Sequence, residues 1–394
     1  MKKILIIGAS VLQLPAILRA KELGFYVGVA DYNPNAVGIP YADEYFNVST
    51  IDAEGVTACA KKFAPDGIFT LATDMPMRSV AAAGKALSLP AITPETALRA
   101  TDKAEMIKAF AEHGVEHPWF YVISSLEEAK ALKGKITYPC ISKPTDSSGS
   151  RGVMLIKNGE ELLESLAYSA GNGRSGAVIV EEYLQGHEVS VEVIVLRGVP
   201  HILQITDKLT TGAPHFVEMG HSQPSRLPEG DLEKIRDLAS RAVLAVGIEN
   251  GPAHVEIMLT KNGPRMIELG ARMGGDCITT HLVPLSTGID MVEASMRIAL
   301  GEEPDVTPKK QRGSAIRFFD VPSGRIESIE GADEARALAG VTEITFTKSV
   351  GDTAGEIGSS TDRVGFVIAE AETAEAAVAI CEQALKTVTV TVKS

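Results

Sequence analysis

Apolar and polar positions follow one consistent pattern at the start of the chain. A continuous apolar run occurs at residues 3–8, further strands are expected at residues 26–30, 44–48 and 67–70, and helices are expected between them. Continuous apolar runs are typical of parallel strands that are covered on both faces. The pattern therefore predicts a parallel α/β lobe, in which ligands bind beyond the carboxyl ends of the strands.

Two loops of this lobe, residues 8–13 and 73–75, are candidates for binding a small substrate because each follows a predicted strand. The first loop begins Gly8-Ala-Ser-Val-Leu-Gln and lacks the second and third glycines of G-x-G-x-x-G. Without those glycines a pyrophosphate cannot approach the backbone closely. A nicotinamide dinucleotide site with Asp31 on the ribose is therefore disfavoured.

The middle of the chain has shorter strands and fewer helices. Strands are expected at residues 121–123, 139–144 and 178–184, with a helix beginning at Ser125, and together they predict a small α+β lobe. The next strand, at residues 189–196, alternates apolar side chains with polar ones.

Residues 204–225 contain two prolines and show neither helical nor strand periodicity. We expect a long loop here, and a long loop inside a compact chain is usually functional. Glu218 and His221 are its notable polar pair, although a surface glutamate and a surface histidine would look the same in the sequence. The helix expected at residues 231–246 has an ordinary apolar stripe and is assigned no chemistry.

Two apolar runs flank Lys261-Asn262-Gly263 and predict a β-hairpin. A two-residue loop would put Glu256 and Glu268 on opposite faces of the hairpin. A three-residue loop with a left-handed Gly263 would set these two glutamates directly opposite each other. The alternation favours the three-residue loop, because it gathers apolar side chains on one face. That face would hold Val255, Ile257, Leu259, Ile267 and Leu269, and the other would hold His254, Glu256, Met258, Met266, Glu268 and Gly270.

In this register the hairpin brings two carboxylates together. The Cβ atoms of Glu256 and Glu268 would lie about 5 Å apart, and a cation between the carboxylates would offset their repulsion. Oxygen ligands and a polyphosphate partner indicate Mg²⁺ or Mn²⁺. Arg272 would reach the same face as a fixed cation suited to an oxyanion. A solvated polar face on an edge hairpin is the alternative.

Beyond the hairpin, a helix is expected at residues 290–300 and a linker with two prolines at residues 301–311. Short strands and helices at residues 313–392 then predict a small α+β cap, to which the sequence assigns no chemistry.

Composition narrows the class of protein. The chain has 394 residues, enough for two or three domains, and its net charge of −13 without a basic block makes nucleic acid and anionic membranes poor partners. No apolar run approaches membrane-spanning length, and the N-terminal run is too short for a signal peptide. The four cysteines are scattered without metal-ligand spacing. We therefore expect a cytoplasmic protein with reduced thiols.

Two lysines occupy positions that a bound anion would explain. Asp102 caps an expected helix and Lys103 lies in its first turn, where the helix terminus is already positive. Lys143 ends an apolar strand and precedes the Ser/Gly-rich loop at residues 145–152. The N–H groups of such a loop can surround phosphate oxygens, although this loop lacks the G-K-[ST] ending of a Walker loop. An exposed lysine and a flexible turn are the alternatives.

The strand at residues 178–184 runs into Gln-Gly-His-Glu188. Its exposed backbone and the carboxylates of Glu181 and Glu182 could hold an adenine edge, and Glu188 could accept from ribose hydroxyls. Taken alone, these glutamates would more often be surface charge.

The segments TDKAEM, ISKP with SSGSRG, VEEYLQGHE, VEI and IELGAR follow the parallel α/β lobe in this order. Each motif alone is weak, but their order resembles that of an ATP-grasp enzyme over roughly residues 1–300. The resemblance implies an α/β protein of ATP-grasp architecture with an antiparallel central sheet, and it implies ATP with Mg²⁺ or Mn²⁺ as cofactors. The implied domains are an N-terminal parallel α/β domain at residues 1–100, an ATP-grasp domain at 101–310 with a lid at about 119–188, and a C-terminal cap at 311–394.

The resemblance also assigns roles to individual residues. Phosphate contacts are implied for Lys103, Lys143, Ser147, Ser148, Gly149 and Ser150. Adenine and ribose contacts are implied for Glu181, Glu182, Leu184 and Glu188. Metal coordination is implied for Glu256 and Glu268.

The segments PHFVEMGHSQPS and ARMGGD are similar to those of bacterial L-amino acid ligases of the bacilysin-synthetase type. That likeness implies Glu218 and His221 beside the substrate amine, and Arg272 and Gly275 beside the carboxylate and its acyl phosphate. At Gly270 the chain departs from the common E-x-N-x-R, so a second metal contact is absent or is supplied by water or another side chain. The chain is also similar to the ATP-grasp module of carbamoyl phosphate synthetase, but one copy of the module argues against the complete reaction.

The sequence thus predicts an ATP-dependent, ADP-forming carboxylate–amine ligase that makes an amide through an acyl phosphate, with amino acids as the expected substrates. Lys143 and Arg272 would be catalytic, because they neutralise charge on the transferred phosphoryl group. The alternatives are another ATP-grasp enzyme, such as a purine-pathway one, and a nucleotide-binding regulatory protein without turnover. The sequence leaves the two substrates and the oligomeric state open, although the family is often homodimeric.

Overall fold

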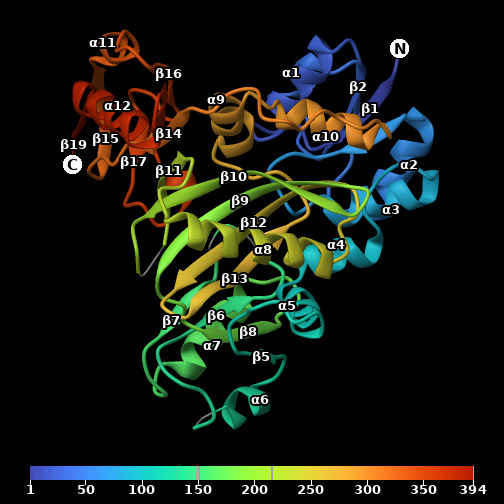
Figure 1. Ribbon diagram of the computed structural model, residues 1–394, viewed down its shortest axis with the longest axis vertical. Helices are drawn as coiled ribbons and strands as arrows, with labels where there is room; N and C mark the ends of the chain where they lie inside the picture. The colour runs from blue at the N-terminus through green and yellow to red at the C-terminus, as the bar shows by residue number, and fades with distance from the viewer. Residues whose placement is uncertain (133, 148, 150, 214–215, 394) are drawn as a thin grey trace.

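The computed structural model describes residues 1–132, 134–147, 149, 151–213 and 216–393. A large antiparallel sheet lies at the centre, with the N-terminal lobe and the C-terminal elements beside it and a smaller lobe at its far end (Figure 1).

The N-terminal lobe is the predicted parallel α/β unit. Its strands form one parallel sheet in the order β3-β2-β1-β4. The elements are β1 (Lys3–Ile7), α1 (Leu14–Glu22), β2 (Tyr26–Asp31), η1 (Ile39–Tyr41), β3 (Glu44–Asn47), α2 (Ala53–Phe63), β4 (Gly67–Phe69) and α3 (Met77–Leu87).

Strand β1 shows why its apolar run is continuous. Ile4 packs in the same cluster as Ile17 of α1, whereas its neighbour Leu5 packs on the other face with Phe63 of α2. Because helices cover both faces of the sheet, no position in the strand is left for a polar side chain.

Two helices, α4 (Pro94–Thr101) and α5 (Lys103–Glu112), lead into the smaller lobe. This lobe is an antiparallel sheet in the order β5-β8-β6-β7, with α7 packed on it. Its elements are β5 (Phe120–Ile123), α6 (Leu126–Ala131), β6 (Cys140–Pro144), β7 (Met154–Ile156), α7 (Leu162–Gly171) and β8 (Val178–Glu182).

The central sheet has the order β13-β12-β9-β10-β11-β14-β18-β16, and all its pairs are antiparallel. Its first part is built from β9 (His187–Leu196), β10 (Val199–Thr210), β11 (Glu218–Gln223), α8 (Glu229–Ala245), β12 (Gly251–Thr260) and β13 (Gly263–Gly270).

The expectation of a long loop at residues 204–225 is wrong. Most of that segment belongs to β10 and β11, which pair with each other from Asp207 to Thr210. Three consecutive polar residues, Thr206, Asp207 and Lys208, interrupt the alternation in β10, and this hid the strand period.

Helix α8 covers one face of the central sheet, and its predicted apolar stripe is buried. Ile235 and Leu238 pack in one cluster with Val191 of β9 and Val255 of β12. Since side chains alternate along a strand, the polar residues of β9 and β12 point to the opposite face. That face carries the candidate site.

After β13 the chain forms η2 (Ile278–Leu282), α9 (Val283–Thr287) and α10 (Met291–Ala299), and then residues 301–312 without helix or strand, as expected for a linker. The C-terminal elements follow. They are β14 (Gly313–Phe318), β15 (Gly324–Glu330), α11 (Ala332–Arg336), β16 (Val341–Phe346), β17 (Thr353–Ala354), η3 (Ser360–Asp362), β18 (Gly365–Ala371), α12 (Ala374–Thr387) and β19 (Thr389–Lys393).

The C-terminal α+β segment is joined to the centre by its sheet. Strands β14, β18 and β16 extend the central sheet beyond β11, and β17, β15 and β19 form a separate small sheet. The predicted boundary at residue 100 falls within α4, and the one at residue 310 falls just before β14. The division into domains itself stays a prediction.

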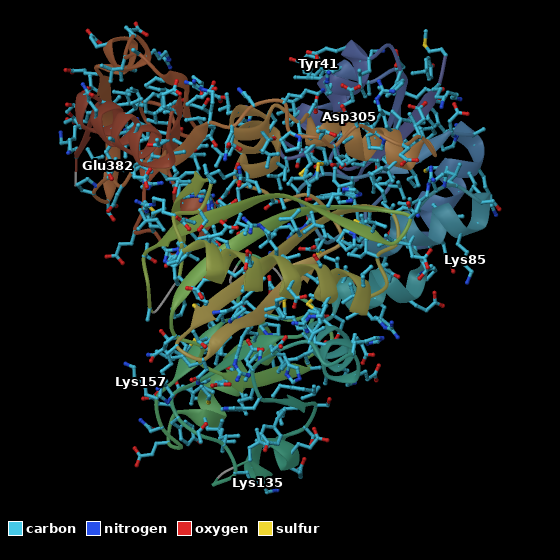
Figure 2. The ribbon with its side chains drawn as sticks, in the orientation of Figure 1. Tyr41, Lys85, Lys135, Lys157, Asp305 and Glu382 are labelled. Atoms are coloured by element: carbon cyan, nitrogen blue, oxygen red, sulfur yellow. The ribbon has the colours of Figure 1, made fainter. Side chains whose placement is uncertain are left out.

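Charged side chains such as Lys85, Lys157 and Glu382 lie on the periphery of the molecule (Figure 2). Among the residues that the structure describes, no helix combines the length and the apolar character that crossing a membrane requires.

Candidate active site

Glu256 of β12 and Glu268 of β13 lie directly opposite each other, as the sequence predicted. The predicted cause is wrong. Thr260 pairs with Gly263, so the hairpin loop has two residues, and a β-bulge between Glu256 and Ile257 then shifts the register by one. A bulge adds one unpaired residue to a strand and therefore has the same effect on register as a longer loop.

The bulge also exchanges two side chains between the faces. Met266 pairs with Ile257 and is completely buried in the core, whereas the prediction had placed it beside the glutamates. Ile267, predicted for the apolar face, lines a cavity together with Glu256 and Glu268. One apolar side chain therefore lies next to the two carboxylates.

Lys103 lies where two lobes meet. Asp102 caps α5 by accepting from the N–H groups of Ala104 and Glu105, and this places Lys103 at the first position of the helix. Its Nζ lies 2.7 Å from Glu268 Oε2 and donates to the carbonyl oxygen of Ser147 at 3.0 Å. The lysine thus links one of the paired glutamates to the Ser/Gly-rich loop.

Lys143, at the end of β6, is almost buried and forms an ion pair with Glu181 of β8. Burial alone would lower the pKa of Lys143, but the carboxylates of Glu181 and Glu268 outweigh burial and raise it. The ammonium group therefore stays protonated and can bind an anion in a site largely removed from water.

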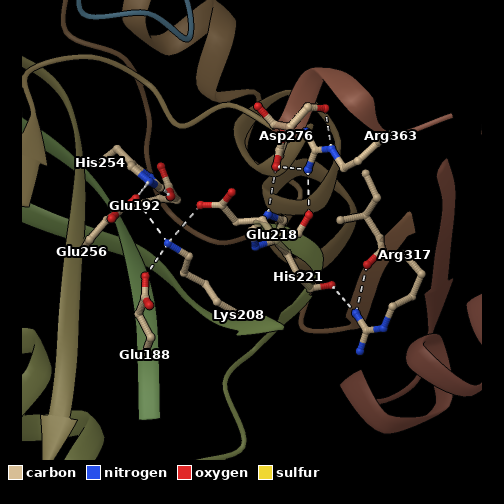
Figure 3. Close-up of polar contacts among 12 residues, drawn as sticks. Glu188, Glu192, Lys208, Glu218, His221, His254, Glu256, Asp276, Arg317 and Arg363 are labelled. Atoms are coloured by element: carbon tan, nitrogen blue, oxygen red, sulfur yellow. Dashed lines mark hydrogen bonds and ion pairs between the residues drawn. The ribbon is translucent and has the colours of Figure 1, made fainter. Parts of the chain in front are cut away.

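Lys208 of β10 was missed by the sequence reading. Its Nζ lies 2.5 Å from Glu188 Oε1, 3.3 Å from Glu256 Oε1 and 3.6 Å from Glu218 Oε1 (Figure 3). Burial lowers its pKa, but these three carboxylates raise it well above the usual value. Conversely, Lys208 helps to hold the pKa of Glu256 well below its usual value, against the effect of burial. Glu256 is therefore ionised, as a metal ligand must be.

Two further titratable residues, His254 and Glu192, lie beside Glu256 in the central sheet. His254 pairs with Glu192 across β12 and β9, and its Nδ1 lies 2.6 Å from Glu192 Oε1. Burial lowers the pKa of His254, but Glu192 more than compensates and raises it to about 9. The other ring nitrogen lies 3.4 Å from Glu256 Oε1, so a protonated imidazole faces the carboxylate from within the sheet.

One cavity, between the lid sheet and the central sheet, gathers most of the predicted nucleotide residues. It is lined by Lys103, Lys143, Ser147, Gly149, Glu181, Glu182, Leu184, Glu188, Glu218, Glu256 and Glu268, as well as by Lys208. Ser148 and Ser150 lie outside the described residues. The roles of all these residues in binding stay predictions.

Arg272 follows β13 and forms a two-point ion pair with Asp74, which lies in the predicted substrate loop after β4. Its Nε and Nη2 donate to Asp74 Oδ1 and Oδ2, both at 2.9 Å. Burial alone would lower the pKa of Arg272, but the carboxylate of Asp74 outweighs burial and raises the pKa above its usual value. Gly270 makes room for the pair, because a Cβ there would lie 2.6 Å from Asp74 Oδ1.

His221 of β11 does not line the nucleotide cavity, and it does not line the neighbouring cavity that contains Asp74 and Arg272. Its predicted contact with the substrate amine stays a prediction. It is buried, and its Nε2 lies 3.4 Å from Asp276 Oδ2. Arg363, from the C-terminal segment, donates to both carboxylate oxygens of Asp276 at 2.7 Å and to the carbonyl oxygen of Glu218 at 3.0 Å (Figure 3). Gly275 precedes this aspartate and has open space where a Cβ would lie.

The residues that sequence reasoning missed are Lys208, Asp74 as a partner of Arg272, the pair of His254 and Glu192, and Arg363. Correct assignment of β10 as a strand would have placed Lys208 on the same face as Thr206 and hence on the polar face. No local pattern indicates Arg363, because its contacts join segments far apart in the chain.

Two family models match parts of this chain. Residues 136–280 match the family model for the ATP-grasp domain, and residues 317–393 match that for the L-amino acid ligase C-terminal domain 2. The alanine–anticapsin ligase of Bacillus subtilis is 28% identical over 323 residues, which cover 76% of this chain and 67% of that protein.

Two further proteins are similar along much of the chain. The L-arginine-specific L-amino acid ligase of Bacillus subtilis is 26% identical over 276 residues, covering 68% of this chain and 66% of that protein. The crystal structure of an L-amino acid ligase from Bacillus licheniformis shares the fold, with a TM-score of 0.87 and 24% identity over 100% of this chain and 99% of that one.

Proposed function

We propose that this chain, which combines an ATP-grasp domain with an L-amino acid ligase C-terminal domain, joins the carboxylate of one amino acid to the amine of another and converts ATP to ADP and phosphate. The observation that carries the proposal is the convergence of paired glutamates, Glu256 and Glu268, with three partly exposed cations, Lys103, Lys143 and Arg272. The names of the similar ligases support amino acids as substrates.

The two glutamates fit Mg²⁺ or Mn²⁺. They are carboxylates on facing strands, and the pKa of Glu256 is held well below its usual value, so that this oxygen ligand is ionised. Among the described residues no group of three or more metal-ligating side chains is present, so the nucleotide phosphates and water would supply the other ligands. A divalent ion bound here would neutralise charge on the phosphates of ATP.

The first step forms an acyl phosphate. The substrate carboxylate attacks the γ-phosphorus of ATP, an oxygen–phosphorus bond forms, and the bond to the ADP oxygen breaks. Negative charge spreads over the phosphoryl oxygens, and Lys143 and Arg272 stabilise it from positions that are fixed before the reaction. Catalysis of this kind depends on positioning and charge rather than on a covalent nucleophile.

The second step forms the amide. The amine nitrogen attacks the acyl carbon, a carbon–nitrogen bond forms, and phosphate leaves as the nitrogen loses its proton. Glu218 and His221 are proposed to hold the amine, and Arg272 and Gly275 the acyl group. Arg272 can donate to the oxyanion that develops on the acyl carbon.

The test is a panel of amino acid pairs with ATP and Mg²⁺, in which ADP release and the mass of any product are measured. We expect ADP together with an amide whose mass is that of the two amino acids less one water. The variant Glu268→Gln, which removes one carboxylate charge, should abolish both signals. ADP release without any amide, or no release with any pair, would refute the ligase proposal.

A further inference from the structure

A second cavity, of about 370 Å³, adjoins the nucleotide cavity between the N-terminal lobe, the lid and the central sheet. Both cavities share Lys103, Ser147, Glu256 and Glu268. A volume of this size is in the range of sites for small molecules. Because it opens beside the predicted phosphate and metal contacts, a carboxylate bound here would lie next to the γ-phosphate of ATP.

Two opposite charges project into this cavity from different lobes. Asp74 comes from the loop between β4 and α3, and Arg272 comes from the end of β13. Their side chains are 20% and 14% exposed, and two hydrogen bonds of 2.9 Å join them. Each group is thus the main charge partner of the other in a site where an unpaired charge is unfavourable.

The backbone around the pair is shaped to admit it. A Cβ on Gly270 would lie 2.6 Å from Asp74 Oδ1 and 2.9 Å from Arg272 Nε, so a side chain at this position would displace the aspartate, the arginine or both. The glycine therefore keeps an acidic side chain of the N-terminal lobe within reach of the arginine that is proposed to hold the substrate carboxylate.

We propose that Asp74 and Arg272 together form the subsite for an α-amino acid acyl donor, in which Asp74 binds the ammonium group and Arg272 the carboxylate. The proposal rests on the ligase function above and adds Asp74 as the residue that selects an α-amino acid as the acyl donor. An α-amino acid carries its two charges on groups attached to one carbon, and the adjacent aspartate and arginine present the matching charges side by side. Binding exchanges the Asp74–Arg272 pair for two pairs with the substrate.

The same arrangement disfavours a carboxylate that lacks an ammonium group. Such a donor would take Arg272 from Asp74 and leave the aspartate without a counter-charge beside a second anion. Sites built to pair a polar substrate group discriminate strongly against analogues that lack it. The aspartate is therefore a specificity-determining residue as well as a binding one.

The test measures acyl phosphate formation with hydroxylamine as the acceptor, so that the donor is the only carboxylic acid present. L-Alanine is compared with propanoate and L-valine with isovalerate, each pair differing only in the ammonium group. Wild-type protein should prefer the amino acids in kcat/KM by at least about a hundredfold. Asp74→Asn should lower kcat/KM for the amino acids about ten- to a hundredfold and leave or raise that for the plain acids.

Gly270→Ala keeps both charges and should reduce the preference in the same direction, so the test does not depend on the fold of one variant. Calorimetric titration of L-alanine and propanoate, with Mg²⁺ and a non-hydrolysable ATP analogue, measures the same preference without turnover. The matched control is Asp66→Asn, since Asp66 accepts from the backbone N–H of Lys3 in the N-terminal sheet and lines neither cavity. It should keep the wild-type preference.

Equal losses for both classes of donor in Asp74→Asn, or an unchanged preference, would overturn the subsite while leaving the ligase function intact. No hydroxamate from wild-type protein with any donor would instead overturn the ligase function, and the subsite with it.

Discussion

Lys208 Nζ lies 3.3 Å from Glu256 Oε1, and this contact joins the glutamate to a buried cation from the neighbouring part of the sheet. Glu188 and Glu218 approach the same ammonium group, which is 3% exposed. Three carboxylates around one lysine carry an excess of negative charge. A divalent cation bound at Glu256 would reduce that excess. The metal and Lys208 would therefore both offset the negative charge of these carboxylates.

Replacement of Lys208 by Met should therefore destabilise the protein most when Mg²⁺ is absent. Removing one partner of a buried ion pair leaves an uncompensated charge, and the expected loss of unfolding free energy is about 3–5 kcal/mol. Mg²⁺ should recover part of this loss and should stabilise the variant more than it stabilises the wild type. Denaturant unfolding with EDTA and with Mg²⁺ measures both effects.

The control is Lys234→Met, which removes an exposed lysine paired with Asp231 on α8. Exposed pairs contribute at most about 1 kcal/mol, and the Mg²⁺ response should stay that of the wild type. If Lys208→Met and the wild type respond equally to Mg²⁺, the metal does not bind next to this cluster.

Replacement of Arg272 by Met should lower kcat/KM for the carboxylate substrate about a hundredfold or more. Its hydrogen bonds to charged groups are worth about 1.5–3 kcal/mol each, and a factor of ten in rate corresponds to about 1.4 kcal/mol. The KM for ATP should change little, because Arg272 lines the second cavity and does not line the nucleotide cavity. Steady-state hydroxamate formation gives both parameters.

A matched arginine is Arg241 on α8, which pairs with Glu116 and Asp237 at the surface. Arg241→Met should retain wild-type kinetics. Wild-type kcat/KM in Arg272→Met would remove the arginine from the proposed mechanism.

The sequence predicted the parallel lobe, the small α+β lobe and the hairpin because each depends on local periodicity. It predicted that Glu256 faces Glu268, but for the wrong reason. The register shifts between Glu256 and Ile257, where Ile267 of the partner strand has no pair, and this bulge replaces the expected loop length. Local sequence does not report a bulge, because packing of Met266 into the core decides it. The predicted division of the hairpin side chains between an apolar and a polar face was therefore right except at Met266 and Ile267.

The ion pairs that complete the site could not be predicted from the sequence, for a different reason. Asp74 and Arg272 are separated by 198 residues, and Arg363 and Asp276 by 87. Such contacts depend on how the lobes pack, and no spacing rule relates them. Most lysines and glutamates of the nucleotide cavity were named because they lie in short motifs whose order resembles that of an ATP-grasp enzyme, and Glu256 and Glu268 because they face each other on one predicted hairpin.

The buried pair of His254 and Glu192 should make stability fall as pH rises. The pKa of His254 is about 9 in the folded protein and lies near 6.5 when the chain is unfolded. The stabilisation is therefore fully present below pH 6.5 and is lost as pH rises through 9, with a total of roughly 2–4 kcal/mol. Denaturant unfolding in EDTA across this range measures it.

Because other groups titrate in the same range, the quantity to compare is the difference between the wild type and His254→Gln. That difference should shrink steadily between pH 6.5 and pH 9. Glu192→Gln removes the carboxylate that raises the histidine pKa and should lose the same pH dependence. A difference that stays constant across the range would mean that the imidazole is not protonated in the folded protein.

Arg363 should control binding of the amine substrate from outside the two cavities. It donates to both oxygens of Asp276 and to the carbonyl oxygen of Glu218, and its side chain is 8% exposed. Arg363→Met should therefore shift the start of β11 and raise the KM for the amine about tenfold or more, while the KM for ATP stays within about twofold of wild type. Arg363→Lys keeps the charge but cannot make the two-point contact. Its KM for the amine should lie between those of the wild type and Arg363→Met.

A general loss of stability could also lower activity, and a double variant separates the two causes. In Arg363→Met the carboxylate of Asp276, which is 25% exposed, is left without its two-point partner, whereas Arg363→Met combined with Asp276→Asn removes both charges. The double variant should regain much of the unfolding free energy but keep the raised KM for the amine, because the contact to Glu218 is still missing. Recovery of both quantities together would show that Arg363 acts only through stability, and a KM for ATP that rises as much as that for the amine would show that it has no specific role at the amine site.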